Sequence, residues 1–152
     1  MKLTSKERKE FYSYTHEIIN SEKVQEMKKY IQHGKTNTYT HCMSVAILSY
    51  WICRRFNLKV NIRSLIIGAL LHDFYLYDWH IKNPDRKGLH GFTHPTASLK
   101  NADKYFSLSP LERDIIQKHM WPLTITDFPK YRESFIVCIA DKICSLKETF
   151  NR

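Results

Sequence analysis

Residues 64–73 read Ser-Leu-Ile-Ile-Gly-Ala-Leu-Leu-His-Asp, an apolar segment that ends in two polar side chains. Burying His72 and Asp73 at the tip of an apolar helix costs free energy unless a partner compensates them. The same problem recurs at Asp141, which closes the apolar run 135–140. A buried carboxylate needs a cation or several hydrogen-bond donors. The leading candidate is a metal ion that distant histidines bring to these carboxylates.

The composition is that of a globular protein of moderate size. The chain has 152 residues, of which 43% are hydrophobic and 26% charged, with only four glycines and five prolines. This length favours one domain over residues 1–152, and so few turn-forming residues argue against an all-β fold. We expect residues 1–35 to form an N-terminal helical extension packed on the rest of that domain.

Hydrophobic spacing and capping residues predict helices throughout the chain and no strand. The expected helices cover about residues 5–18, 22–32, 38–56, 62–71, 95–105, 110–119 and 131–148. Thr38 is the expected cap of the third helix, and Pro95 suits the first turn of the fifth. The stripe from Val45 to Phe56 and the run 136–139 are expected in the core, and residues 74–93 in a long loop. The predicted fold class is all-α, a compact bundle of about six to seven helices.

The termini, cysteines and charge restrict the cellular setting. The basic start of the chain has no apolar region after it, and no segment reaches the roughly 20 apolar residues of a membrane span. The four cysteines form no Cys-x-x-Cys pair and fit reduced core thiols, although a disulfide stays open. Cys42, next to His41, is the one cysteine of interest, with a buried spectator as the favoured interpretation. We expect a cytoplasmic protein.

The net charge of +9 favours anionic partners through long-range attraction, and a solvated basic surface explains it equally well. The positive charges are spread along the chain without an arginine-rich block, so we expect no specific nucleic-acid binding. The expected partner is a small anionic substrate that contains phosphate. The sequence makes no prediction about the oligomeric state.

Six side chains near helix ends or on one helix face are candidate metal ligands: His41, His72, Asp73, His94, His119 and Asp141. Asp141 shares a helix face with Val137, which lies four residues earlier and should turn inward. Nitrogen and oxygen ligands of this kind suit iron, manganese, zinc or nickel. Because the set contains no thiolate, ligand softness does not narrow the choice of metal.

This order of residues resembles the HD-domain superfamily of metal-dependent phosphohydrolases, whose signature is a His, an adjacent His-Asp pair and a distant Asp. His41 in Tyr-Thr-His, the pair after Gly68-Ala-Leu-Leu, and Asp141 in Ala-Asp-Lys occupy those places. The likeness covers nearly all of the chain after residue 35. The family fold is an all-α bundle, which agrees with the independent helix prediction.

The resemblance also implies the ligand sets. One ion, iron or manganese in first place and zinc or nickel as alternatives, would be held by His41, His72, Asp73 and Asp141. Members with two metals carry extra histidines, and a second ion would be held by His94, His119 and a bridging Asp73. His90 competes with His94 for that place, and one of the two would instead contact the substrate.

The implied reaction is hydrolysis of a phosphoester or phosphoanhydride by a metal-bound hydroxide, with His72 and Asp73 as essential catalytic residues. Lys142 is a further catalytic candidate that could offer a charge to a phosphate, and a surface lysine is an equal alternative. Two rival hypotheses stay open: a sensor that binds metal and an anion without turnover, and a basic interaction module with structural histidines.

The aromatic loop after Asp73 is the expected source of specificity. Tyr77 and Trp79 could stack a nucleobase, and His80 could meet a phosphate together with Lys82, Arg86 and Lys87. Phe74 and Tyr75 are expected to roof the core instead. No Gly-Tyr-Pro motif follows the later histidines, which argues against the cyclic dinucleotide phosphodiesterases. In its length and its extra histidines, the chain resembles the small bacterial members of the superfamily, among them the symmetrical dinucleoside tetraphosphate hydrolases.

Overall fold

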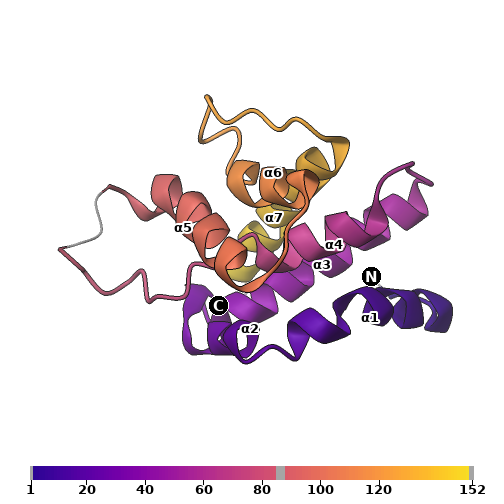
Figure 1. The fold of residues 1–152 in the computed structure, drawn as a ribbon, viewed down its shortest axis with the longest axis horizontal. Helices are drawn as coiled ribbons and strands as arrows, with labels where there is room; N and C mark the ends of the chain where they lie inside the picture. Colours follow the sequence, from indigo (N-terminus) through magenta and orange to yellow (C-terminus); the bar gives the residue numbers. More distant parts are fainter. Residues whose placement is uncertain (1, 85–87, 151–152) are drawn as a thin grey trace.

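A computed structural model describes residues 2–84 and 88–150 of the chain. Helices dominate these residues, which confirms the all-α class: α1 (Ser5–Ile19), α2 (Glu22–Glu26), α3 (Thr38–Arg55), α4 (Ile62–Leu71), α5 (His90–Tyr105), α6 (Pro110–Lys118) and α7 (Arg132–Phe150). A 3-10 turn η1 (Met27–Lys29) and two short strands, β1 (Ile31–His33) and β2 (Thr36–Asn37), separate α2 from α3 (Figure 1). In these residues no helix is long and apolar enough to cross a membrane.

Local capping explains why several helices begin where the sequence predicts. Thr4 and Glu7 form a capping box at α1, and Ser109 and Glu112 form a second at α6. The side chain of Asn61 accepts a hydrogen bond from the backbone of Ser64 at 3.0 Å and starts α4. Each cap satisfies backbone N–H groups that the first helical turn leaves unpaired.

The helix predicted over residues 22–32 is wrong in its second half. It stops at Glu26, and β1 and β2 pair antiparallel in a short hairpin that was not expected. Gly34 adopts a φ of 56° in the turn, a conformation that glycine tolerates best. The cap of α3 is Asn37, one residue before the expected Thr38, which is buried and donates to the carbonyl of Tyr30.

The helix predicted from Pro95 begins earlier, at His90, so that Pro95 lies inside α5. The backbone N–H groups of Phe92 and Thr93 both donate to the carbonyl of Leu89 and form the additional first turn. His94 therefore lies within the helix, four residues after His90, and the two share a face.

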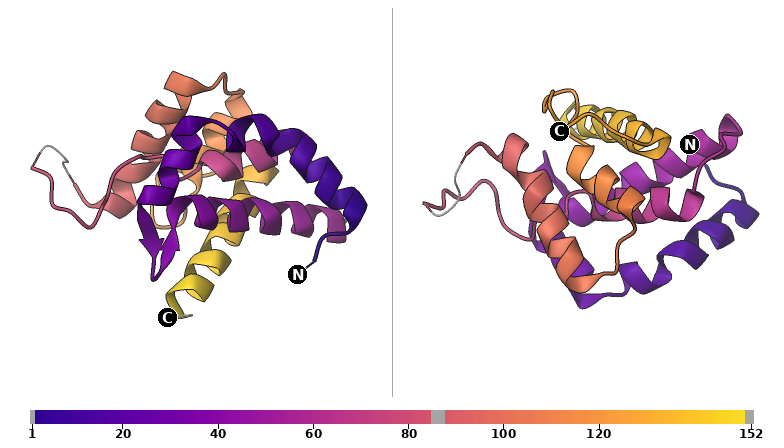
Figure 2. Two further views of the ribbon diagram at one scale, coloured as in Figure 1. Left: turned by 90° about the horizontal axis from the view of Figure 1, so that it is seen from below. Right: turned by 45° about the horizontal axis from the view of Figure 1, so that its top comes forward.

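The apolar helix α4 lies at the centre of the fold, with every residue from 64 to 71 buried. It packs against α3, α1 and α6, and α7 lies against α3 and α6 (Figures 1 and 2). A Cβ on Gly68 would lie 2.7 Å from the side chain of Ile115, so glycine is what permits the close approach of α4 and α6. The N-terminal segment contacts this body through α1 on α4 and β1 on α3 and α7.

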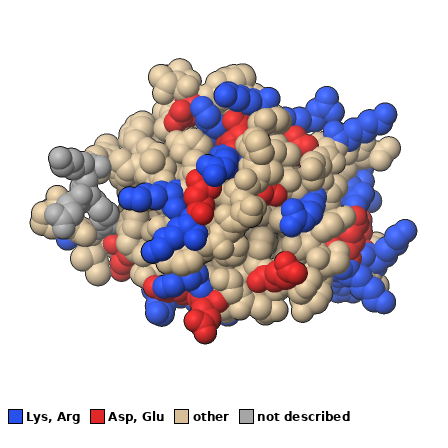
Figure 3. Space-filling view, in the orientation of Figure 1, with Lys and Arg blue, Asp and Glu red and all other residues tan. Residues whose placement is uncertain are grey.

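Two expected core positions are wrong. Val45 and Val137 are fully buried as predicted, but Phe56 is 66% exposed at the end of α3 and Ile139 is 56% exposed on α7. Helical spacing identifies a face but does not tell how far the covering elements reach. Lysine and arginine side chains are spread over the visible surface with acidic ones between them, as expected from the sequence (Figure 3).

Candidate metal centre

Five helices bring the six predicted ligands to one buried place. His41 comes from α3, the pair His72 and Asp73 follows α4, His94 lies in α5, His119 ends α6, and Asp141 lies in α7. All six side chains are buried. The carboxylates are therefore neither far apart nor open to solvent, which is the arrangement that the metal hypothesis requires.

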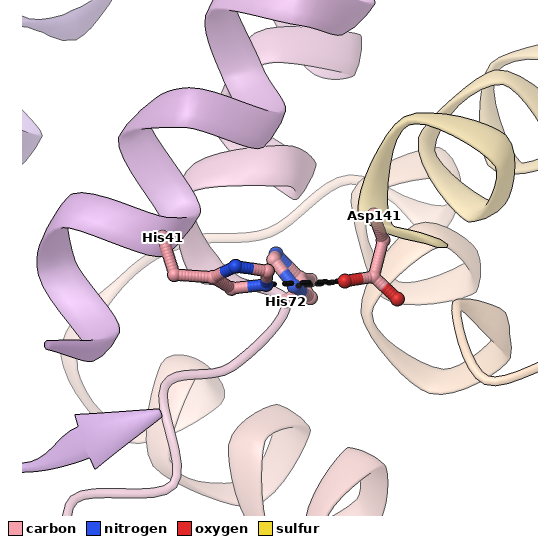
Figure 4. A group of neighbouring side chains, drawn as sticks. All are labelled: His41, His72 and Asp141. Atoms are coloured by element: carbon pink, nitrogen blue, oxygen red, sulfur yellow. Dashed lines mark hydrogen bonds and ion pairs between the residues drawn. The ribbon is translucent and has the colours of Figure 1, made fainter. Parts of the chain in front are cut away.

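The first half of the centre contains His41, His72 and Asp141, whose ligand atoms all lie within 4.8 Å of one another (Figure 4). The Nε2 atom of His41 lies 3.1 Å from Oδ1 of Asp141, and Nε2 of His72 lies 3.6 Å from the same oxygen. Oδ2 of Asp73 lies 3.3 Å from His72 Nε2 and 3.7 Å from His41 Nε2.

The second half contains His94 and His119 on the other oxygen of the same aspartate. Oδ1 of Asp73 lies 3.0 Å from Nε2 of His94 and 3.5 Å from Nε2 of His119. One carboxylate thus presents Oδ2 to the first half and Oδ1 to the second. A bridging Asp73, which the family resemblance implies, would require this arrangement of its two oxygens.

The second nitrogen of three of these histidines is held by a backbone carbonyl. Each Nδ1 lies 2.8 Å from its carbonyl oxygen: His72 with Ala69, His94 with His90, and His119 with Ile116. A carbonyl oxygen only accepts, so each Nδ1 carries the proton. Nε2 is thereby left as the atom for a metal ion, because it presents a lone pair whenever the ring is neutral.

The resulting arrangement of acceptors fits a cation. The Nε2 atoms of His94 and His119 face each other at 2.8 Å, and two lone pairs at that distance repel unless a positive charge lies near them. Within residues 2–84 and 88–150, Nε2 of His72 and Oδ1 of Asp73 are buried and have no hydrogen-bond partner. Buried polar atoms of this kind are costly, and a divalent ion would satisfy them.

The electrostatics of the two halves differ. Burial lowers the pKa of His41, but hydrogen bonds to Asp141 and Glu148 outweigh it and raise that pKa to about 10. Burial lowers the pKa of His119 to about 4. Burial alone would raise the pKa of Asp73, yet the nearby His72 and His94 hold it well below its usual range. The carboxylates are therefore ionised, and in the first half protons on histidine balance them.

Several supporting residues were missed by the sequence analysis. Oε2 of Glu148 lies 2.8 Å from Nδ1 of His41 and orients that ring. Gln32, on β1, donates from Nε2 to Oδ2 of Asp73 at 2.5 Å, and its own oxygen accepts from the hydroxyl of Tyr75. Glu148 lies seven residues after Asp141 on one helix face, a signal that the sequence contained. Gln32 carried no such signal, because its segment was assigned to a helix.

A cavity of about 510 Å³ opens onto the centre and contains Asp73, His94, His119 and Asp141 in its wall. Met120 and Leu123 line the same cavity. The predicted catalytic residue Lys142 also lines this cavity. Its ammonium group donates to the carbonyl of His119 at 2.9 Å and lies 3.7 Å from Oδ2 of Asp141.

The residues predicted to contact the substrate do not all lie in the same cavity. Trp79 and His90 line the 510 Å³ cavity, and the ring of His90 stacks on that of His94 at 4.6 Å between centroids. Of His90 and His94, it is His94 that lies within the ligand cluster, because its Nε2 contacts Oδ1 of Asp73. Tyr77 lines a neighbouring cavity of about 650 Å³.

His80 lines neither cavity; its ring contacts Asp78 at 3.0 Å and is half exposed. The predicted phosphate contacts Arg86 and Lys87 lie outside the described residues. Phe74 and Tyr75 are buried, which confirms the prediction that they roof the core.

A family model described as HD domain matches residues 38–146 of the chain. This range contains every predicted metal ligand and lies between the N-terminal segment and the last residues of α7. Neither the curated proteins nor the solved structures contain a match to this chain.

Proposed function

This chain belongs to the HD-domain family, and we propose that it is a metal-dependent phosphohydrolase that cleaves a phosphoester or phosphoanhydride. The substrate would be a nucleotide or another small phosphorylated metabolite. The observation that carries the proposal is the position of Asp73, whose two oxygens face the two histidine pairs at 3.0 Å from His94 and 3.3 Å from His72.

The residues present suit two divalent ions. His41, His72, Asp73 and Asp141 would hold one ion, and Asp73, His94 and His119 the other. A pair of such ions, when bound, activates water for attack and clamps phosphoryl oxygens. Imidazoles with carboxylates suit iron, manganese, zinc or nickel, and we put iron or manganese first because of the family resemblance.

The remaining residues of the cavity bind and orient. Lys142 sits at the edge of the ligand cluster and supplies a positive charge within reach of a phosphate. Trp79, Met120 and Leu123 form a less polar wall that would receive the organic part of a substrate and exclude water. The volume of about 510 Å³ is in the range of small-molecule sites.

The test combines metal analysis with a substrate screen. Purified protein should contain two ions per chain and, with iron or manganese, hydrolyse members of a panel of artificial phosphodiesters, mononucleotides and dinucleoside polyphosphates. Asp73→Ala should lose both bound metal and turnover. The matched control is Asp103→Asn, because this α5 aspartate pairs with Arg113 at the surface.

Three outcomes would contradict the proposal in different ways. Full activity of Asp73→Ala would exclude the centre as the site of reaction. Bound metal without turnover across the whole panel would indicate a sensor that binds metal and anion. Absence of bound metal under all loading conditions would leave the histidines with a structural role.

A further inference from the structure

The thiol of Cys42 lies at the metal centre. Cys42 follows His41 on α3 and is 1% exposed. A ligand atom from each of Cys42, His72 and Asp73 lies within 4.8 Å of the other two. Within the described chain, the other three cysteines belong to no such group, and Cys138 donates its thiol to the carbonyl of Lys118 instead.

A second observation shows that this place requires a ligand. Nδ1 of His72 is taken by the carbonyl of Ala69, and Nε2 is fully buried without a hydrogen-bond partner in the described residues. Nε2 is therefore the ring atom available to an ion. His72 is the member shared by two groups, one with His41 and Asp141 and one with Cys42 and Asp73. The sulfur of Cys42 thus lies within 4.8 Å of a ring nitrogen of His72 and of a carboxylate oxygen of Asp73, two of the proposed ligands of the first ion.

We propose that Cys42 supplies a sulfur ligand to the ion held by His72. The inference rests on the metal centre proposed above and adds a ligand of a different kind to its nitrogen and oxygen set. The incoming ion replaces the thiol proton, which leaves to solvent, so charge and atoms balance. Thiolate is a soft ligand, and it shifts the preference of this half of the centre toward iron(II), zinc and cobalt and away from manganese and magnesium.

Cobalt(II) substitution tests the inference directly, because a cobalt–thiolate bond produces a near-ultraviolet charge-transfer band that nitrogen and oxygen ligands do not. The wild-type protein loaded with cobalt should show this band. Cys42→Ser should lose it while still binding cobalt, as seen from the visible bands. Cys53→Ser is the matched control, because Cys53 is equally buried on the same helix and should leave the band unchanged.

A variant that retains Cys42 alone, with Cys53→Ser, Cys138→Ser and Cys144→Ser, should keep the band. It answers the question even if Cys42→Ser does not fold. Competition between zinc and manganese is a second measurement: loss of Cys42 should move the bound ratio toward manganese.

The outcomes separate this inference from the function on which it rests. Cobalt bound to the wild-type protein without the near-ultraviolet band, or a band that survives in Cys42→Ser, would overturn the sulfur ligand and leave the metal centre intact. A wild-type protein that binds no cobalt, iron, zinc or manganese would overturn the metal centre itself.

Discussion

The two halves of the centre share Asp73 but are built differently. In the first half, a remote side chain holds His41: Glu148, near the end of α7, orients that ring from 107 positions away, while His72 is held by the carbonyl of Ala69. In the second half, His94 and His119 are held by carbonyls four and three residues before them, so each helix orients its own ligand. The orientation of His41 therefore depends on tertiary packing, whereas the orientation of both histidines in the second half needs only intact helices.

The two halves also differ in how their charges are balanced. Asp141 and Glu148 surround His41 and raise its pKa to about 10, whereas burial lowers the pKa of His119 to about 4. Without metal, a proton occupies the first half, and His119 stays neutral in the second. The two halves of one centre can therefore differ when metal is absent: a proton takes the place of the ion at His41, whereas the ring of His119 carries no extra proton.

The largest effect is expected from removing a metal ligand of one half at a time. His119→Ala should reduce the bound metal from two ions per chain to one, and His41→Ala should do the same from the other side. Both should lower activity by more than the about 10–100-fold that loss of an outer partner costs. Metal analysis of each variant measures this, with the exposed His16→Ala on α1 as the control. Loss of both ions from either ligand variant would show that the halves are not independent sites, and retention of both would show that the replaced histidine is not a required ligand.

Removing the remote support should affect the first half alone. Glu148→Gln keeps a hydrogen-bonding group beside His41 but removes the charge, and we expect metal affinity there to fall about 10–100-fold. The ion of the second half should be unaffected. Titration with zinc would resolve the two affinities, and Glu17→Gln, a surface glutamate, is the control. An equal loss in both halves would contradict the division.

The pH dependence of the metal-free protein should report the proton held in the first half. His41 has a folded pKa of about 10 against 6.5 unfolded, so its contribution to stability is complete below pH 6.5 and disappears as the pH rises toward 10. The depressed pKa of Asp141 acts oppositely: its contribution is present above pH 3.8 and is lost as the pH falls below that value.

Thermal unfolding of chelator-treated protein measures this dependence. The midpoint of the wild-type protein should fall between pH 6.5 and 10, and the fall should be smaller in His41→Gln. The His16→Gln protein serves as reference. Identical profiles for wild type and His41→Gln would show that the proton is not on His41.

The smallest expected effect concerns the close contact between α6 and α4, the helix that His72 and Asp73 follow. Gly68→Ala places a Cβ 2.7 Å from Ile115 and should destabilise the protein by about 1–3 kcal/mol through overpacking. Chemical denaturation measures the free energy of unfolding. The companion Ile115→Ala removes the Cδ1 and Cγ2 atoms that crowd the new methyl group, and the double variant should recover part of the loss. Additive destabilisation would place the strain elsewhere.

Several parts of this fold could be predicted from short stretches of sequence. The capping boxes at Thr4 and Ser109 act within three residues, so they identify helix starts without any tertiary information. The hairpin around Gly34 could not be predicted this way, because the two strands are too short to show alternation. Pro95 predicts a helix start because proline is favoured in the first helical turn, but α5 begins earlier, where the backbone N–H groups of Phe92 and Thr93 donate to the carbonyl of Leu89.

The identities of the six candidate ligands were apparent from residue type, order and apolar context, because a buried carboxylate requires compensation whatever the fold. Their distances, the two directions of the Asp73 carboxylate and the place of Cys42 followed only from how α3, α4, α5, α6 and α7 pack. The physical reason is range. Propensity, capping and hydrophobic period act over a few residues, whereas a metal centre depends on atoms that the chain brings together from a hundred positions apart.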